Sequence, residues 1–189
     1  LYLRHCLDQG KPYHKNCPRK WISPPLRDAG DIGHPEKILL FRHKYITGDL
    51  NLKVTPQLQN IINSALKDAQ DSGHEFVTPE HLLKASLDVP VVCDLLLICG
   101  GNVEYIRQGV NEYIKNNILV SKTTAPLQTA GFHSVIERAI IHCASAEKSE
   151  LEITDIIVSM LEETNNYCSY FLRSGGIEQL RLLEVVSYI

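Results

Sequence analysis

The chain has 189 residues, 44% of them hydrophobic and 22% charged, and a formal net charge of −3, which fits one folded domain or one domain with an appendage. The longest apolar run, residues 89–99, is interrupted by Asp94 and is too short to cross a bilayer. No secretory signal follows Leu1 and the six cysteines are scattered, so we expect a cytoplasmic protein without disulfides or a membrane segment.

Residues 1–50 differ in composition from the rest of the chain. Residues 1–49 contain nine Lys or Arg and five Asp or Glu, whereas residues 50–189 contain ten and seventeen. Prolines and glycines divide the first segment so closely that no window longer than about ten residues remains for a regular element. We interpret residues 1–50 as an irregular, loosely ordered appendage. Its start at Leu1 rather than Met also allows upstream, non-native sequence.

Four helices are predicted in the next part of the chain. Thr55-Pro56 and Thr78-Pro79 each match an N-cap residue followed by Pro at the first helical position. The third helix, which Pro90 opens, is apolar on nearly every side, and this predicts a helix at the centre of the core. The predicted helices cover residues 55–72, 78–88, 90 to about 99 and 102–116.

The second half of the chain repeats the first at a nearly fixed spacing. Six apolar positions of the first helix recur 74 residues later with the same helical periodicity, and Gly100-Gly101 recurs 75 residues later as Gly175-Gly176. We therefore predict an all-α domain over residues 51–189, with eight helices in two pseudo-symmetric four-helix repeats. Repeat one covers residues 54–116, the connector 117–130 and repeat two 131–189, with helices at about 131–146, 154–163, 166–174 and 177–189.

Two groups of residues have a superficial similarity to metal sites. His74 and His81 are seven residues apart and lack the i, i+4 spacing of a helical ligand pair, so we expect a structural or capping role for them. The other group lacks a short Cys-x2–4-Cys unit, because its cysteines are eleven residues apart. It consists of His5, Cys6, His14 and Cys17. We predict no metal site and no cofactor.

Catalysis has little support in the sequence. Cys143 lies beside His142, but neighbours on a helix point about 100° apart, and Cys143 occupies an apolar stripe position that packing explains. No G-x-x-x-x-G-K-[ST] motif is present, so the chain has no P-loop. We predict that the chain is not catalytic and keep two alternatives open: a Cys/His hydrolase, and a nucleic-acid binder that uses a basic arm. That arm would consist of Lys11, Lys15, Arg19, Lys20 and Trp21.

The segment His-Glu-Phe-Val-Thr-Pro-Glu-His-Leu-Leu at residues 74–83 resembles the signature at the start of the Clp amino-terminal domain. That domain is a double four-helix repeat that precedes the ATPase modules of the Clp/Hsp100 unfoldases. Residues 131–139 resemble the opening of its second repeat, and residues 170–173 resemble its close. The resemblance covers residues 52–189, and residues 137–142 are most similar to a ClpA-type helix.

The resemblance implies a docking domain that delivers substrates or their adaptor to an ATP-driven ring and its ClpP peptidase. For a ClpA-like domain it implies the adaptor ClpS, with Glu75, Glu80 and Thr129 on the partner-binding surface. Physics alone favours a simpler role for Glu80, because a carboxylate in the first turn of a helix stabilises it by about 0.3–1 kcal/mol. The alternatives are the N-domain of a ClpB- or ClpC-type chaperone, or a free-standing helical adaptor that binds protein substrates directly. We expect no nucleic acid or membrane partner.

Overall fold

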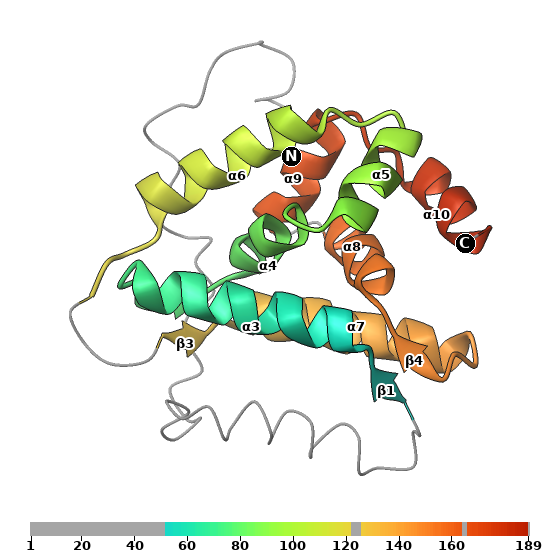
Figure 1. Cartoon of the computed structure of the whole chain (residues 1–189), viewed down its shortest axis with the longest axis horizontal. Helices are drawn as coiled ribbons and strands as arrows, with labels where there is room; N and C mark the ends of the chain where they lie inside the picture. Colours follow the sequence, from blue (N-terminus) through green and yellow to red (C-terminus); the bar gives the residue numbers. More distant parts are fainter. Residues whose placement is uncertain (1–51, 122–125, 164–165, 189) are drawn as a thin grey trace.

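The computed structural model describes residues 52–121, 126–163 and 166–188, and within these ranges the chain folds into eight helices (Figure 1). The predicted all-α class with two sets of four helices is therefore confirmed. The predicted appendage at residues 1–50, its basic arm and the His/Cys group at residues 5–17 lie outside the described residues.

The first four helices begin and end within about two residues of their predicted bounds. The N-cap predicted at Thr55 is confirmed, because its Oγ1 accepts a hydrogen bond from the backbone N–H of Leu58 at 3.4 Å. Asn102 caps the fourth helix in the same way through the N–H of Tyr105, at 3.0 Å. The elements are β1 (Lys53–Val54), α3 (Pro56–Asp71), β2 (Phe76–Val77), α4 (Pro79–Ser86), α5 (Pro90–Ile98) and α6 (Val103–Asn117).

The second set has the same order of elements. Thr129, which lies 74 residues after Thr55, caps its helix by accepting from the N–H of Phe132 at 3.3 Å. The elements are β3 (Leu127–Gln128), α7 (Ala130–Ser145), β4 (Glu150–Leu151), α8 (Ile153–Glu162), α9 (Tyr167–Ser174) and α10 (Gln179–Ser187). Helix for helix, α3 to α6 correspond to α7 to α10.

Four short strands, which the sequence did not predict, join the two sets. Strand β1 pairs in parallel with β4, and β2 pairs in parallel with β3, so each pair takes one strand from each set. The N–H of Lys53 donates to the carbonyl of Ser149 at 2.9 Å, and the N–H of Thr129 donates to the carbonyl of Val77 at 3.0 Å. The backbone N–H and C=O groups of the strands in each set therefore find their hydrogen-bond partners in the other set.

The spacing between equivalent residues changes along the chain. Helices α3 and α4 begin 74 residues before α7 and α8, whereas α5 and its C-cap Cys99 end 76 residues before α9 and its C-cap Gly175. Gly100 therefore corresponds to Gly176, and both have a positive φ, +84° and +94°. The spacing of 75 predicted for the glycine pairs is wrong, because the second set has two more residues between the start of α8 and the end of α9.

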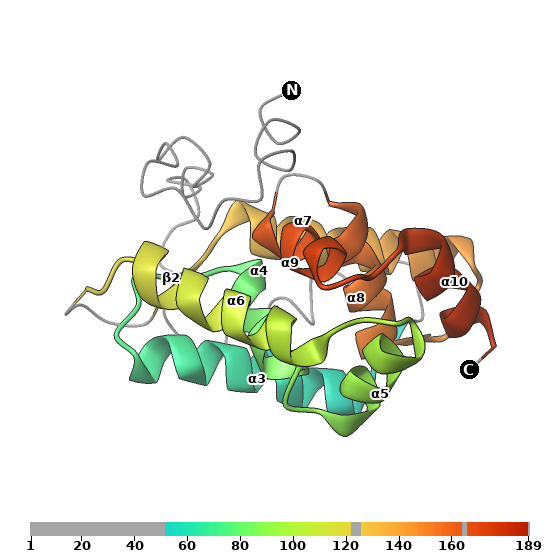
Figure 2. The ribbon, with the colours of Figure 1, turned by 90° about the horizontal axis from the view of Figure 1, so that it is seen from above.

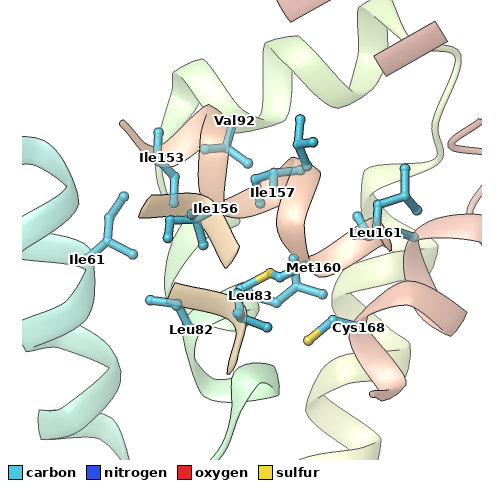
Figure 3. Close-up of a cluster of buried hydrophobic side chains, with 14 of the residues drawn as sticks. Ile61, Leu82, Leu83, Val92, Ile153, Ile156, Ile157, Met160, Leu161 and Cys168 are labelled. Carbon is cyan, nitrogen blue, oxygen red and sulfur yellow. The ribbon is translucent and has the colours of Figure 1, made fainter. Parts of the chain in front are cut away.

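The centre of the core is formed by α4 and α8. In Figure 1 these two helices lie between the long pair α3 and α7 and the remaining four helices. Residues 156–161 of α8 are all buried, and Figure 3 shows Ile156, Ile157 and Met160 packed against Leu82 and Leu83 of α4. A core helix with apolar residues on every side is thus present, but it is α8.

The prediction that the third helix is central to the core is wrong. Helix α5 buries Val92, Leu95 and Leu96, while the side chains on its opposite side are exposed to solvent. A helix that is apolar all round fits the core, but the same pattern also fits a surface helix with one apolar side left uncovered. Figure 2 shows α5 at one end of the molecule, beside α10.

Candidate functional site

Glu75 lies at the start of the β2–β3 pair, and its main chain is held from both sides. Its N–H donates to the carbonyl of Leu119 at 2.8 Å, and its carbonyl accepts from the N–H of Leu127 at 2.9 Å. The side chain is half-buried, and among the described residues its carboxylate takes part in no hydrogen bond or ion pair. The main chain of Glu75 is therefore fixed in position, while its carboxylate keeps its hydrogen-bonding capacity.

Exposed apolar side chains flank Glu75, and sequence reasoning missed them. Leu119, Val120 and Leu127 are 55%, 72% and 41% exposed. The two backbone hydrogen bonds of Glu75 bring Leu119 and Leu127 beside it, and Val120 forms an isolated β-bridge with the preceding residue, His74. These side chains could have been noticed in the sequence, because they are aliphatic residues within the polar connector between the repeats, which has no helical periodicity. We call Glu75 with these three side chains the β2–β3 edge.

Thr129 lies beside the β2–β3 edge but is only 6% exposed. Its Oγ1 donates to the carbonyl of Val77 at 3.2 Å and accepts from the N–H of Phe132 at 3.3 Å. One hydroxyl group thus caps α7 and ties that helix to β2, in the other repeat. Glu75 precedes the β2–β3 pair and Thr129 follows it, and the two hydrogen bonds of the Thr129 hydroxyl give this residue a structural role.

Glu80 is 3% exposed, so its carboxylate is not an open surface charge. Its Oε1 accepts a hydrogen bond from the backbone N–H of Tyr167 at 3.1 Å. Tyr167 is the first residue of α9, so Glu80 on α4 binds the N-terminus of a helix in the other repeat. Burial raises the pKa of Glu80, and it raises the pKa of the neighbouring Cys168 thiol well above its ordinary value, with the Glu80 charge adding to that shift.

His74 and His81 form a buried pair with a capping role, as predicted. Nδ1 of His74 lies 3.0 Å from Nε2 of His81, and Nδ1 of His81 accepts from the N–H of Thr78 at 3.2 Å. Burial lowers the pKa of both rings, that of His81 to about 4. Asp155, which lies 74 residues after His81, accepts from the N–H of Glu152 at 2.9 Å and so makes the equivalent cap with a carboxylate.

Cys143 is buried, as its place in the apolar stripe predicted. Burial, with a smaller effect of Asp155, raises the pKa of its thiol to about 12, so the thiolate needed for nucleophilic attack does not form at neutral pH. His142 is directed away from Cys143, with its Nε2 3.4 Å from Oε2 of Glu162.

In the described ranges, no three His, Cys, Asp or Glu residues lie close enough to hold a metal ion. None of the described helices combines the length and apolarity that spanning a membrane requires.

Comparison with known proteins identifies a family and a set of structural relatives. Residues 53–174 match the family model described as the Clp repeat (R) N-terminal domain. The chain is 29% identical over 135 residues to a ClpA homolog protein of Fuscovulum blasticum, an alignment that covers 69% of this chain. The chain spans only 17% of the length of that relative.

Several solved structures share the fold. The Hsp104 N-terminal domain from Candida albicans has a TM-score of 0.62 at 16% identity and covers 70% of this chain and 88% of its own. The N-domain of ClpV from Vibrio cholerae has a TM-score of 0.62 at 21% identity, with 72% and 84% covered. A ClpV N-domain in complex with a VipB peptide has a TM-score of 0.61 at 23% identity, with 71% and 88% covered.

Proposed function

Because the chain belongs to the Clp repeat N-terminal domain family, we propose that it is the substrate- and adaptor-docking domain of a ClpA-like, ATP-dependent unfoldase that feeds proteins to the ClpP peptidase. The domain itself binds and does not catalyse, and we place the parent protein in the cytoplasm. The ClpV N-domain solved with a VipB peptide supports the part of this proposal that concerns the binding of protein segments.

We further propose that the adaptor is ClpS and that it binds at the β2–β3 edge. The observation that carries this is the half-buried carboxylate of Glu75, positioned by two backbone hydrogen bonds among exposed Leu119, Val120 and Leu127. Apolar side chains around a single charge exclude water when a partner docks, and this strengthens an ion pair to a basic group of that partner.

Glu80 and Thr129 belong to the proposed site in a different way. Both are buried and hydrogen-bonded to main-chain groups of the other repeat, so Glu80 ties α4 to the start of α9 and Thr129 ties α7 to β2. Substituting Glu80 by Lys would place an ammonium group where a buried carboxylate accepts from Tyr167, and folding would be lost along with binding. Glu75 is therefore the residue to test.

The test is a calorimetric titration of the 189-residue chain with a ClpS protein. We expect Glu75→Lys to weaken binding by about tenfold or more, because a desolvated charge pair is replaced by a repulsion. Glu150→Lys is the matched control, because Glu150 is exposed on β4 in the other strand pair. It should change the affinity by less than about twofold.

Thermal melting of both variants shows whether the fold is intact. Unchanged affinity in Glu75→Lys would remove the β2–β3 edge from the adaptor site. If the unmodified chain does not bind ClpS, the adaptor part of the proposal is wrong and direct capture of substrates becomes the better function.

A further inference from the structure

The neighbouring helices α5 and α10 leave five apolar side chains open to solvent. Val91, Leu97 and Ile98 of α5 are 52%, 58% and 58% exposed, and Leu180 and Leu183 of α10 are 70% and 40% exposed. The two helices contact each other and lie side by side in Figures 1 and 2, at the end of the molecule opposite β2 and β3. We call these five side chains the α5–α10 face.

The other repeat provides an internal comparison for this face. At the spacing of 76 residues, α5 corresponds to α9 and α10 corresponds to α6, and these two helices also contact each other. Four of the five apolar positions have polar or charged equivalents there. Leu97 and Ile98 correspond to Arg173 and Ser174, and Leu180 and Leu183 correspond to Glu104 and Arg107. The fold therefore accepts polar residues at these positions, and core packing does not explain the apolar ones.

The charges around the α5–α10 face are mostly negative. Asp94 lies on the exposed side of α5, Glu178 immediately precedes α10, and Glu184 lies on α10. The one basic residue of the two helices, Arg181, has its Nη1 3.4 Å from Oε2 of Glu184. In the part of the chain that the structure describes, no ion pair involves Asp94 or Glu178. A partner with basic residues beside its apolar ones complements this surface.

We propose that the α5–α10 face docks an amphipathic helical segment of a partner protein, whose aliphatic side chains are flanked by Lys or Arg. Two neighbouring helices present ridges between which a third helix packs, and helix-in-groove recognition uses apolar anchors at i, i+3, i+4 and i+7. This inference rests on the proposed function, because it assumes that the chain binds protein segments. It adds a second surface, distant from the β2–β3 edge, so that a segment and an adaptor bind at the same time.

The probe is a fluorescein-labelled designed helix of about four turns, with Leu at i, i+3, i+4 and i+7 and Lys on its flanks. Fluorescence anisotropy measures its affinity for the 189-residue chain. Ile98→Ser with Leu180→Gln removes apolar contacts without changing the net charge, and it should weaken binding by about tenfold or more. Ile141→Ser is the matched control. Ile141 is 62% exposed on α7, away from this face, and its substitution should change the affinity by less than about twofold.

A second comparison tests the charges. Asp94→Asn with Glu178→Gln should weaken binding of the Lys peptide and reduce its dependence on salt, while a peptide with Glu in place of Lys should bind poorly to every variant. Melting curves confirm that each variant is folded.

Three results would overturn the inference. The first is that the unmodified chain does not bind the Lys peptide. The second is that the Ile98→Ser, Leu180→Gln variant binds the peptide as tightly as the Ile141→Ser variant does. The third is that sedimentation shows a dimer of the chain, which dissociates only in the Ile98→Ser, Leu180→Gln variant. The third result would assign this face to a second copy of the chain. If ClpS binds and the peptide does not, this inference fails while the proposed function stands. If the peptide binds and ClpS does not, only the adaptor part of the proposed function fails.

Discussion

The contact between Nδ1 of His74 and Nε2 of His81 fixes the protonation of both rings. Nδ1 of His81 accepts the N–H of Thr78, so the proton of the neutral ring is on Nε2, which donates to His74. A second proton on either ring would place two donors against each other. Desolvation is the main cause of the lowered pKa values, while the neighbouring ion pair of Asp68 and Lys84 acts in both directions.

The pair should make the folded state sensitive to mild acid. Because the pKa of His81 falls from 6.5 to about 4 on folding, the unfolded state binds more protons between these values. The contribution of the neutral His81 ring to the free energy of unfolding is therefore fully present above pH 6.5, and it is lost as the pH falls toward 4. Urea denaturation at a series of pH values measures this loss. His81→Gln, whose amide oxygen can accept the N–H of Thr78, should flatten the dependence. An unaltered pH profile in His81→Gln would contradict the prediction.

At the scale of single elements, the helices could be predicted because their ends are encoded locally. Thr55 marks a helix start through its own side chain, and Pro56 and Pro79 mark helix starts through their rings. The strands could not be predicted, because Phe76-Val77 becomes a strand only by pairing with Leu127-Gln128, about fifty residues away. The role of Glu80 was missed for the same reason, since Tyr167 lies in the other repeat.

The caps Thr55 and Thr129 allow a matched comparison of a local and an inter-repeat contact. Each hydroxyl caps its own helix, but Thr129 also donates to the carbonyl of Val77. We expect Thr55→Ala to lower the free energy of unfolding by about 0.5–2 kcal/mol, and Thr129→Ala to lower it by about 1 kcal/mol more. Urea denaturation of both variants measures the difference. Equal losses would mean that the Val77 hydrogen bond contributes nothing to stability.

At the scale of the whole molecule, the sequence predicted the duplication but not how the two copies join. The 74-residue periodicity showed that α3 and α7 are equivalent. The exchange of strands depends on contacts between the copies, and the shift to a spacing of 76 depends on two additional residues between the start of α8 and the end of α9. The exposure of α5 could not be predicted either, because an apolar helix gives no sign of which side a neighbour covers.

Each copy should therefore depend on the other for its stability. We expect residues 51–189 to unfold cooperatively without residues 1–50, and residues 51–121 or 126–189 alone to be far less stable, because each loses the partner of both its strands and the contact between α4 and α8. Circular dichroism during thermal melting of the three fragments tests this. A cooperative transition in either half at the temperature of the whole would contradict it, and so would loss of cooperativity on removing residues 1–50.

The cross-paired strands give this chain the architecture of a symmetric dimer whose two subunits are joined in one polypeptide. In a dimer of identical chains, any apolar binding surface is present twice, once on each subunit. Two such surfaces on one dimer would allow dimers to associate into chains. Joining the copies removes that constraint, because Leu97 and Arg173 occupy equivalent positions yet are encoded separately. The duplicated chain can thus carry apolar side chains on one copy and polar side chains at the equivalent positions of the other. Each molecule therefore has a single α5–α10 face.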